Sequence, residues 1–363
     1  MLITLLVFIL VLGLMVFVHE LGHFLVAKKN GVRVDEFAFG FRPRLLSKKV
    51  GETTYALNLI PLGGYVRMAG ESDDEIGPRS YKTKRPMQKI AILVAGSTMN
   101  VLLAWLLLTI LFVTGFEPFI PGTANNPFLS QKPVVSVGQV QSDSPAFVAG
   151  FQTGDQLLSV NKQPIGIDQE FVSRVQGAKG QPIVVEVLRD GQVQVIGVTP
   201  RLNPPEGQGA IGVSLVTSGK ARSSILSAPI ASIYEVGRVV GLSVAGFFDF
   251  VGKLVFNQRV SEDVTGIVGV GALTGVARRL GVDYLIQLMA IISTGLAVVN
   301  LMPILPLDGG HIAVVSYESL TKRKLTDRQF GVFASLGLAF ILVLFAVVTF
   351  KDFIRFDVLG RIF

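Results

Sequence analysis

Four long apolar segments alternate with polar stretches along the chain and predict transmembrane helices. They run from Met1 to about Ala27, from Ile90 to Phe116, from Tyr284 to about Leu305 and from Gly331 to Phe350. Each reaches the length of about 20 residues that an α-helix needs to cross a bilayer. The first segment has no basic start and no convincing small-residue cleavage site, so we interpret it as a retained helix and not as a secretory signal.

The stretches between these segments predict a cytoplasmic loop and an outer soluble domain. Residues 28–89 are strongly basic, which by the positive-inside rule places them in the cytoplasm and both chain ends outside. Residues 133–215 contain short β-branched runs and a capped helix that ends at Gly150, the pattern of an α+β domain. Residues 216–280 mix apolar residues with recurring charges, which favours amphipathic helices on the outer membrane face over a further full span. The chain therefore divides into four parts, 1–132, 133–215, 216–280 and 281–363.

Composition agrees with a polytopic membrane protein. Of the 363 residues, 50% are hydrophobic and only 16% are charged, and the mean hydropathy is +0.56. The net charge of +7 is explained by basic cytoplasmic loops, so we expect the lipid bilayer and not nucleic acid as a partner. The chain has no cysteine, so a metal site must use histidine and carboxylate ligands.

The stretch from Tyr55 to Met68 within the basic loop is apolar but too short and too broken for a span. It predicts a β-hairpin that includes Gly63, Gly64 and Tyr65. Two interpretations stay open: a plain cytoplasmic hairpin, or one that dips into the membrane and pairs its edge with an extended substrate.

The strongest chemical motif is His19-Glu20-Leu21-Gly22-His23, inside the first apolar segment. This His-Glu-x-x-His spacing is typical of zinc proteases. Residues four apart lie on one face of a helix, so His19 and His23 can bind one metal ion together. Glu20 falls beside that face, where it can take a proton from a water molecule at the metal. Such residues are costly in an apolar segment and by default indicate a functional site.

A second unusual stretch, Asn300 to His311, contains two prolines and two glycines that break the third apolar segment. The predicted topology places its Asp308 at a depth similar to that of the two histidines. This permits a zinc site of His19, His23 and Asp308, with water in the fourth position. His311, the third of only three histidines, is left out of this set as a structural or supporting donor.

Two asparagines are candidates for contacts with the substrate carbonyl. Asn300 or Asn100 is placed to hydrogen-bond the scissile carbonyl or its developing oxyanion. For Asn100 a second interpretation stays open, since Gly96 and its small neighbours also suit close helix packing.

Together these motifs resemble the site-2 protease family of intramembrane zinc metalloproteases. The resemblance rests on His19-Glu20-x-x-His23, Asn300-x-x-Pro303-x-x-Pro306-x-Asp308-Gly309, Gly63-Gly64-Tyr65-Val66 and Gly96-x-x-x-Asn100. Residues 133–215 resemble a PDZ domain through Ser144-Pro145-Ala146, Ala149-Gly150 and Gly154-Asp155, with Gly209–Val213 similar to a peptide-binding loop. One departure is Ser97, where members often have proline.

The resemblance implies a bacterial enzyme of the cytoplasmic (inner) membrane with about four transmembrane helices and an inserted extracytoplasmic PDZ domain. It assigns zinc to His19, His23 and Asp308 and catalysis to Glu20. The implied substrates are single-pass membrane proteins, such as anti-sigma factors and remnant signal peptides, usually after a first cut. The alternative is a non-catalytic PDZ-bearing scaffold. Whether the PDZ domain captures a peptide end or filters substrates by size stays open.

Overall fold

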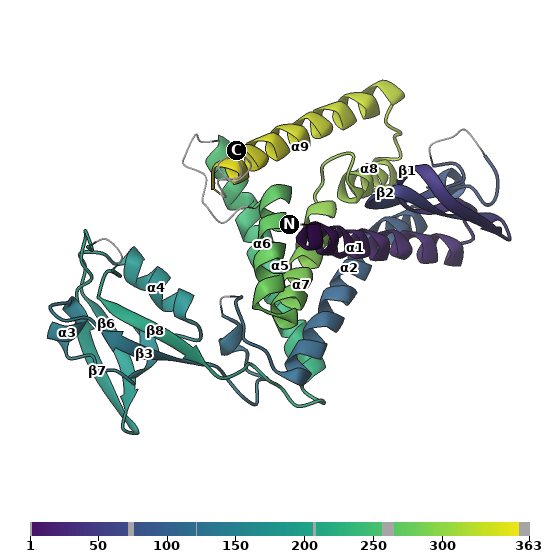
Figure 1. The fold of residues 1–363 in the computed structure, drawn as a ribbon. Helices are drawn as coiled ribbons and strands as arrows, with labels where there is room; N and C mark the ends of the chain where they lie inside the picture. The colour runs from purple at the N-terminus through teal and green to yellow at the C-terminus, as the bar shows by residue number, and fades with distance from the viewer. Residues whose placement is uncertain (1, 72–75, 121, 206–207, 256–264, 356–363) are drawn as a thin grey trace. The chain divides into compact units, whose positions relative to one another are not determined.

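The computed structural model describes residues 2–71, 76–120, 122–205, 208–255 and 265–355 (Figure 1). The chain forms two compact units. We call Met1–Trp105 with Val236–Phe363 the core unit and Leu106–Glu235 the insert unit. Two long helices, α2 and α5, each have residues in both units.

Seven α-helices build the core unit among the described residues. They are α1 (Leu2–Lys29), α2 (Pro86–Thr114), α5 (Ala228–Val255), α6 (Ile267–Leu280), α7 (Val282–Asn300), α8 (Asp308–Thr321) and α9 (Asp327–Arg355). By length and apolar composition, α1, α2, α5, α7 and α9 can each cross a membrane. The described residues thus contain five candidate spans, whereas the sequence predicts about four.

The additional candidate is α5, for which the sequence predicts separate amphipathic helices. The structure instead has one continuous helix, and the charges that argued against it have partners. The Glu235 side chain is buried and accepts a 2.7 Å hydrogen bond from the Thr123 hydroxyl. Asp249 and Lys253, one turn apart, form a 2.6 Å ion pair. The predicted short apolar helix near Gly266 is present as α6.

The predicted hairpin exists, but its strands differ from the prediction. Tyr55 to Met68 is not a hairpin in itself; it belongs to one strand, β2 (Thr53–Met68), which pairs antiparallel with β1 (Val34–Val50). The chain reverses at Gly51, where φ is +61° and glycine is favoured. Residues 36–39 of β1 have partners both in 54–57 and in 64–67 of β2, so β2 bends around β1.

Aromatic side chains attach this sheet to α1. The Phe37 ring lies 5.5 Å from that of Phe17 and 5.0 Å from that of Phe24, measured between centroids. The Phe39 ring lies 6.1 Å from that of Phe17, and it packs so closely on Gly13 that a Cβ atom there would lie 2.8 Å from Phe39 Cζ. Strand β1, together with its partner β2, is therefore held against the helix that carries the His-Glu-x-x-His motif.

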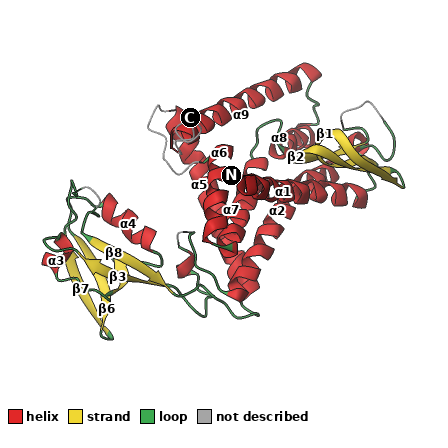
Figure 2. Ribbon diagram, viewed as in Figure 1, coloured by secondary structure: helices red, strands yellow, loops and turns green. Residues whose placement is uncertain are grey.

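The insert unit contains a sheet with the strand order β7-β6-β4-β3-β8, and β5 pairs with β4. Figure 2 shows this sheet with α3 and α4 beside it. Its strands are β3 (Val134–Val140), β4 (Gln156–Val160), β5 (Gln163–Pro164), β6 (Ile183–Arg189), β7 (Gln192–Val198) and β8 (Val213–Ser218), and its helices are α3 (Pro145–Ala149) and α4 (Asp168–Gly177).

The strands expected at 134–137, 183–187 and 193–198 are all present. The capped helix is present as α3: the Ser144 hydroxyl accepts a 3.1 Å bond from the Phe147 amide, and Gly150 ends the helix with φ +87°. Strand β8 continues beyond the expected boundary at 215, and α4 was not predicted. We call residues 133–218 the PDZ-like domain.

The first and last residues of the PDZ-like domain lie close together, where the domain joins the rest of the insert unit. A Cβ atom added at Gly219 would lie 3.6 Å from the Lys132 carbonyl oxygen. Just outside, Gln131 and Arg222 exchange two backbone hydrogen bonds of 3.1 and 3.0 Å, and Phe116 and Ala221 form a similar bridge. The domain is thus inserted at a closed neck.

Candidate metal centre

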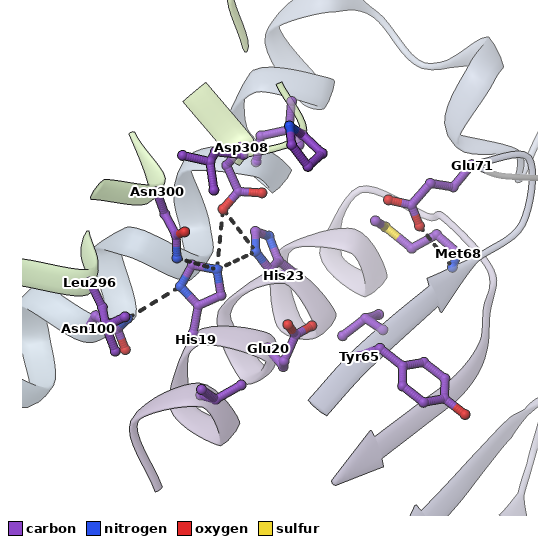
Figure 3. Close-up of a pocket in the computed structure, with 15 residues that line it drawn as sticks. His19, Glu20, His23, Tyr65, Met68, Glu71, Asn100, Leu296, Asn300 and Asp308 are labelled. Atoms are coloured by element: carbon purple, nitrogen blue, oxygen red, sulfur yellow. Dashed lines mark hydrogen bonds and ion pairs between the residues drawn. The ribbon is translucent and has the colours of Figure 1, made fainter. Parts of the chain in front are cut away.

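Helix α1 carries His19, Glu20 and His23, and both histidines are buried in the helix interface (Figure 3). Helix α2 approaches this face of α1 very closely, because a Cβ atom at Gly22 would lie 2.3 Å from the Ala95 carbonyl oxygen. Glycine at position 22 therefore allows α2 to contact the histidine side of α1.

Asp308 reaches the same place from the other end of the chain. Helix α7 ends at Asn300, residues 301–307 turn back around Pro303 and Pro306, and α8 begins at Asp308. Gly309 is packed against this turn so tightly that a Cβ atom would lie 2.2 Å from the Leu301 carbonyl oxygen. The glycines after Asp308 thus let the broken segment fold tightly enough to direct the carboxylate at the histidines.

The three side chains converge on one point. Asp308 Oδ2 lies 3.2 Å from His19 Nε2 and 3.4 Å from His23 Nε2, and the two Nε2 atoms are 3.1 Å apart. Among the described residues, these three form the group of histidine and carboxylate side chains whose ligand atoms all lie within 4.8 Å of one another. The sequence-predicted ligands are therefore neighbours in space.

Hydrogen bonding indicates what this point can hold. His23 Nδ1 lies 2.8 Å from the Ile92 carbonyl oxygen, which can only accept, so Nδ1 carries the ring proton. His23 Nε2 then presents a lone pair toward His19 and Asp308. Asp308 Oδ2 is buried and, apart from its approach to the two imidazole nitrogens, has no hydrogen-bond partner among the described residues. A lone pair and an unpartnered carboxylate oxygen at this spacing fit a cation.

Glu20 lies beside the three side chains, in the wall of a cavity of about 480 Å³. Tyr65, Val66 and Met68 of β2 also line this cavity. A Cβ atom at Gly64 would lie 3.4 Å from Glu20 Cγ, and Gly63 has φ +128°, which favours glycine. The Gly63-Gly64-Tyr65 stretch is thus adjacent to the predicted catalytic carboxylate.

Both predicted asparagines also line this cavity, on different sides of His19. Asn300 Nδ2 lies 3.5 Å from His19 Nε2, on the side of Asp308. Asn100 Nδ2 lies 3.3 Å from His19 Nδ1, on the other side of the ring. Asn300 therefore faces the reaction side of the cluster, whereas Asn100 contacts the ring from behind.

His311 does not join the cluster. Its ring packs against Phe330, with the centroids 5.9 Å apart, and burial lowers the pKa of His311 below its usual value. A neutral imidazole packed on an aromatic ring agrees with its omission from the ligand set.

Sequence reasoning missed Glu71 as a cavity residue. Its side chain lies at the cavity wall, and crowding by protein atoms raises the pKa of Glu71 to about 7, although the residue as a whole is exposed. Its carboxylate accepts a 3.4 Å hydrogen bond from the Met68 amide. The available signal was an acidic run beginning at Glu71 inside an otherwise basic loop.

Comparison with known proteins identifies the family of this chain. The family model described as Peptidase family M50 matches residues 7–344. Metalloprotease MmpA of Caulobacter vibrioides is 31% identical over 403 residues, covering 98% of this chain and 97% of that protein. Zinc metalloprotease RasP of Geobacillus kaustophilus is 27% identical over 431 residues, covering 96% and 97%.

A solved PDZ domain of an SdrC-like protein from Listeria monocytogenes is 22% identical, with a TM-score of 0.21, and covers 23% of this chain and 86% of that chain. The family match extends over nearly the whole sequence, and residues 7–344 include His19, His23 and Asp308. This chain, an integral membrane protein with several apolar helices, belongs to peptidase family M50, a family of metalloproteases.

Proposed function

We propose that this protein is a site-2-type intramembrane zinc endopeptidase. One observation carries the proposal: His19, His23 and Asp308 converge beside Glu20 in one cavity, and the helix that carries His19, Glu20 and His23 can cross a membrane. A metal cluster and an adjacent carboxylate are the parts that metal-assisted peptide hydrolysis needs.

Zinc is the cofactor that these ligands fit best. Two imidazoles and one carboxylate are a typical catalytic zinc set, which leaves one position open. The names of relatives such as zinc metalloprotease RasP support the same ion. When bound, zinc supplies Lewis-acid chemistry, because it acidifies water and polarises a carbonyl group.

The protein's own groups have the following roles in the proposed reaction. Glu20 takes a proton from the attacking water molecule while the oxygen of that water forms a bond to the scissile carbonyl carbon. Glu20 then gives that proton to the amide nitrogen as the C–N bond breaks. Asn300, on the Asp308 side of His19, donates a hydrogen bond to the carbonyl oxygen as negative charge develops there.

Substrate binding is proposed along β2. The stretch 64–67 pairs with β1, and Tyr65 and Val66 line the cavity next to Glu20. An extended peptide added to this strand would bring its backbone past the catalytic carboxylate. A transmembrane helix must unwind locally to bind in this way, so the proposed substrates are single-pass membrane proteins.

We further propose anti-sigma-factor-type proteins and remnant signal peptides as substrates, cut after a first protease has removed the outer domain. The proposed location is the bacterial inner membrane, with the site toward the cytoplasm and the PDZ-like domain and both termini outside. The basic residues of 28–89 support this orientation.

The alternative is a membrane scaffold without activity. A scaffold needs neither the buried ligand cluster nor Glu20, and burying unpaired polar groups is costly. The presence of all four groups in one cavity therefore favours the enzyme.

The test compares Glu20→Gln with the unchanged protein and with Asp249→Asn, which changes an α5 carboxylate outside this cavity. Glu20→Gln should keep bound zinc and lower cleavage of a single-pass reporter by at least about 100-fold, the usual effect of losing a general base. Asp249→Asn should keep both. Undiminished cleavage by Glu20→Gln would contradict the mechanism.

A further inference from the structure

One face of α2 contacts both histidines of the proposed zinc site. Ile92, Gly96 and Asn100 are four residues apart and so lie in one row along the helix. Each makes a different contribution to the same two rings. The Ile92 carbonyl contacts His23, Gly96 leaves space for both rings, and the Asn100 amide contacts His19.

In both histidines, Nε2 faces the cluster and Nδ1 faces α2. His23 Nδ1 donates to the Ile92 carbonyl oxygen at 2.8 Å, which in the neutral ring leaves a lone pair on His23 Nε2. His19 has its Nε2 at the cluster and its Nδ1 3.3 Å from the Asn100 amide. For His19 Nε2 to bind a cation, His19 Nδ1 must carry the proton and donate it.

Asn100 has the acceptor that this proton requires. Its Oδ1 is buried without a hydrogen-bond partner among the described residues. A half-turn of the amide about its last side-chain bond exchanges Oδ1 and Nδ2, so Oδ1 then faces His19 Nδ1. This orientation gives a buried acceptor a donor and leaves a lone pair on His19 Nε2 at the same time.

Asn100 is also held in place independently of the histidine. The residue is fully buried. Its backbone carbonyl accepts a 2.9 Å hydrogen bond from the Ser293 hydroxyl of α7, which is itself buried. The side chain therefore projects from a backbone that is anchored to the helix that ends at Asn300.

We propose that Asn100 is a positioning residue for the metal site and not a substrate-binding residue. It accepts the Nδ1 proton of His19 and so fixes the ring orientation and the tautomer in which Nε2 binds zinc. Ile92 does the same for His23 through its backbone. This inference rests on the proposed zinc function.

The test measures zinc affinity of the full-length protein in detergent by competition with a chromophoric chelator, and Co²⁺ absorption as a second readout. The variants are Asn100→Ala, which removes the acceptor, and Asn100→Asp, which keeps it. Ser97→Ala is the control, because Ser97 is another buried polar residue of α2 that lies outside the row. Circular dichroism reports whether each variant keeps its helix content.

Asn100→Ala should lower zinc affinity by about 10- to 100-fold, the usual effect of losing a supporting contact to a ligand. Asn100→Asp should restore most of it, and Ser97→Ala should match the unchanged protein. The Co²⁺ spectrum should change with Asn100→Ala and return toward normal with Asn100→Asp.

Two results would overturn the inference. One is an Asn100→Ala protein that binds zinc as tightly as the unchanged protein. The other is an equal loss in Asn100→Ala and Asn100→Asp with helix content retained. If the unchanged protein bound no zinc, the proposed function would fail together with this inference, whereas a failure confined to the Asn100 variants leaves the proposed function standing.

Discussion

A Cβ atom at Gly96 would lie 2.4 Å from Nε2 of His23, closer than side-chain atoms approach one another without movement. It would also lie 2.7 Å from Nε2 of His19. We therefore expect Gly96→Ala to push both rings out of the cluster and to lower zinc affinity by at least about tenfold, comparable with the loss of a ligand-supporting contact. Chelator competition measures this change.

The control for this prediction is Gly295→Ala. Gly295 lies in α7, in the same unit, and a Cβ atom there meets no atom within 4 Å. Alanine should be tolerated and favour the helix by up to about 1 kcal/mol. If the Gly96→Ala protein bound zinc as tightly as the Gly295→Ala protein, the interpretation that α2 leaves no room for a side chain beside the histidines would be wrong.

Gly309→Ala should separate Asp308 from the histidines. The added methyl group would meet the Leu301 and Met302 carbonyl oxygens at 2.2 and 2.3 Å, so the turn between α7 and α8 must open. We expect zinc to be lost although all three ligands are present, and thermal unfolding to occur at a lower temperature. Zinc content measured after purification checks this. An Asp308→Ala protein provides the reference for complete loss of that ligand.

The Asp155–Arg189 ion pair predicts how the PDZ-like domain responds to acid. Asp155 is buried, and its carboxylate oxygens accept two 2.6 Å hydrogen bonds from the Arg189 guanidinium. Burial alone would raise the pKa of Asp155, but the bonds from Arg189 and the Gln152 amide lower it below its usual value. The unfolded chain, with a pKa of about 3.9, binds the proton more readily, so stability falls as the pH drops below about 5.

Asp155→Asn should remove most of this acid sensitivity and lower the free energy of unfolding at pH 7 by about 2 kcal/mol, typical of hydrogen bonds to charged groups. Urea unfolding of the fragment 133–219 at pH 7 and pH 4 measures both effects, since this fragment contains its own hydrophobic core. Asp168→Asn, in the first turn of α4, should keep the pH dependence. Equal pH dependence in the unchanged and Asp155→Asn fragments would contradict the role of the pair.

The neck between Lys132 and Gly219 allows the PDZ-like domain to be deleted cleanly. We expect a protein that lacks residues 133–218 to keep zinc and to cleave a reporter with a short outer segment. A size-filtering role of the PDZ-like domain predicts that the deletion protein also cleaves a reporter with a bulky outer domain and that the full chain does not. Paired cleavage assays on the two reporters test this. Loss of cleavage of both reporters by a folded, zinc-loaded deletion protein would favour obligatory capture of a peptide end.

The sequence was most informative where a residue type has few alternative uses. His19, His23 and Asp308 could be grouped from spacing, from a broken apolar segment and from the scarcity of histidine, and the structure places them together. The strands and the capped helix of the PDZ-like domain were predictable from local alternation and from Ser144 and Gly150.

The sequence was least informative where a contact depends on a distant partner. The charges in α5 argue against a long apolar helix when the sequence is considered alone. One of them, Glu235, is buried because it accepts a hydrogen bond from Thr123, and this partner lies 112 positions away in the sequence. The stretch 55–68 resembles a hairpin because Gly63 and Gly64 resemble a turn, whereas in the structure Gly63 packs against the Phe41 ring and Gly64 against the Ala38 carbonyl oxygen of β1. The contact of Asn100 with His19, 81 positions away, has no local signal that distinguishes it from helix packing.

The closed neck of the PDZ-like domain also has an evolutionary consequence. The chain enters the PDZ-like domain at Lys132 and leaves it at Gly219, and these two residues lie close together. The rest of the chain therefore has to bridge only this short distance, whatever the length of the inserted domain. Genetic exchange, duplication or loss of the segment would therefore leave the chain path of the core unit unchanged.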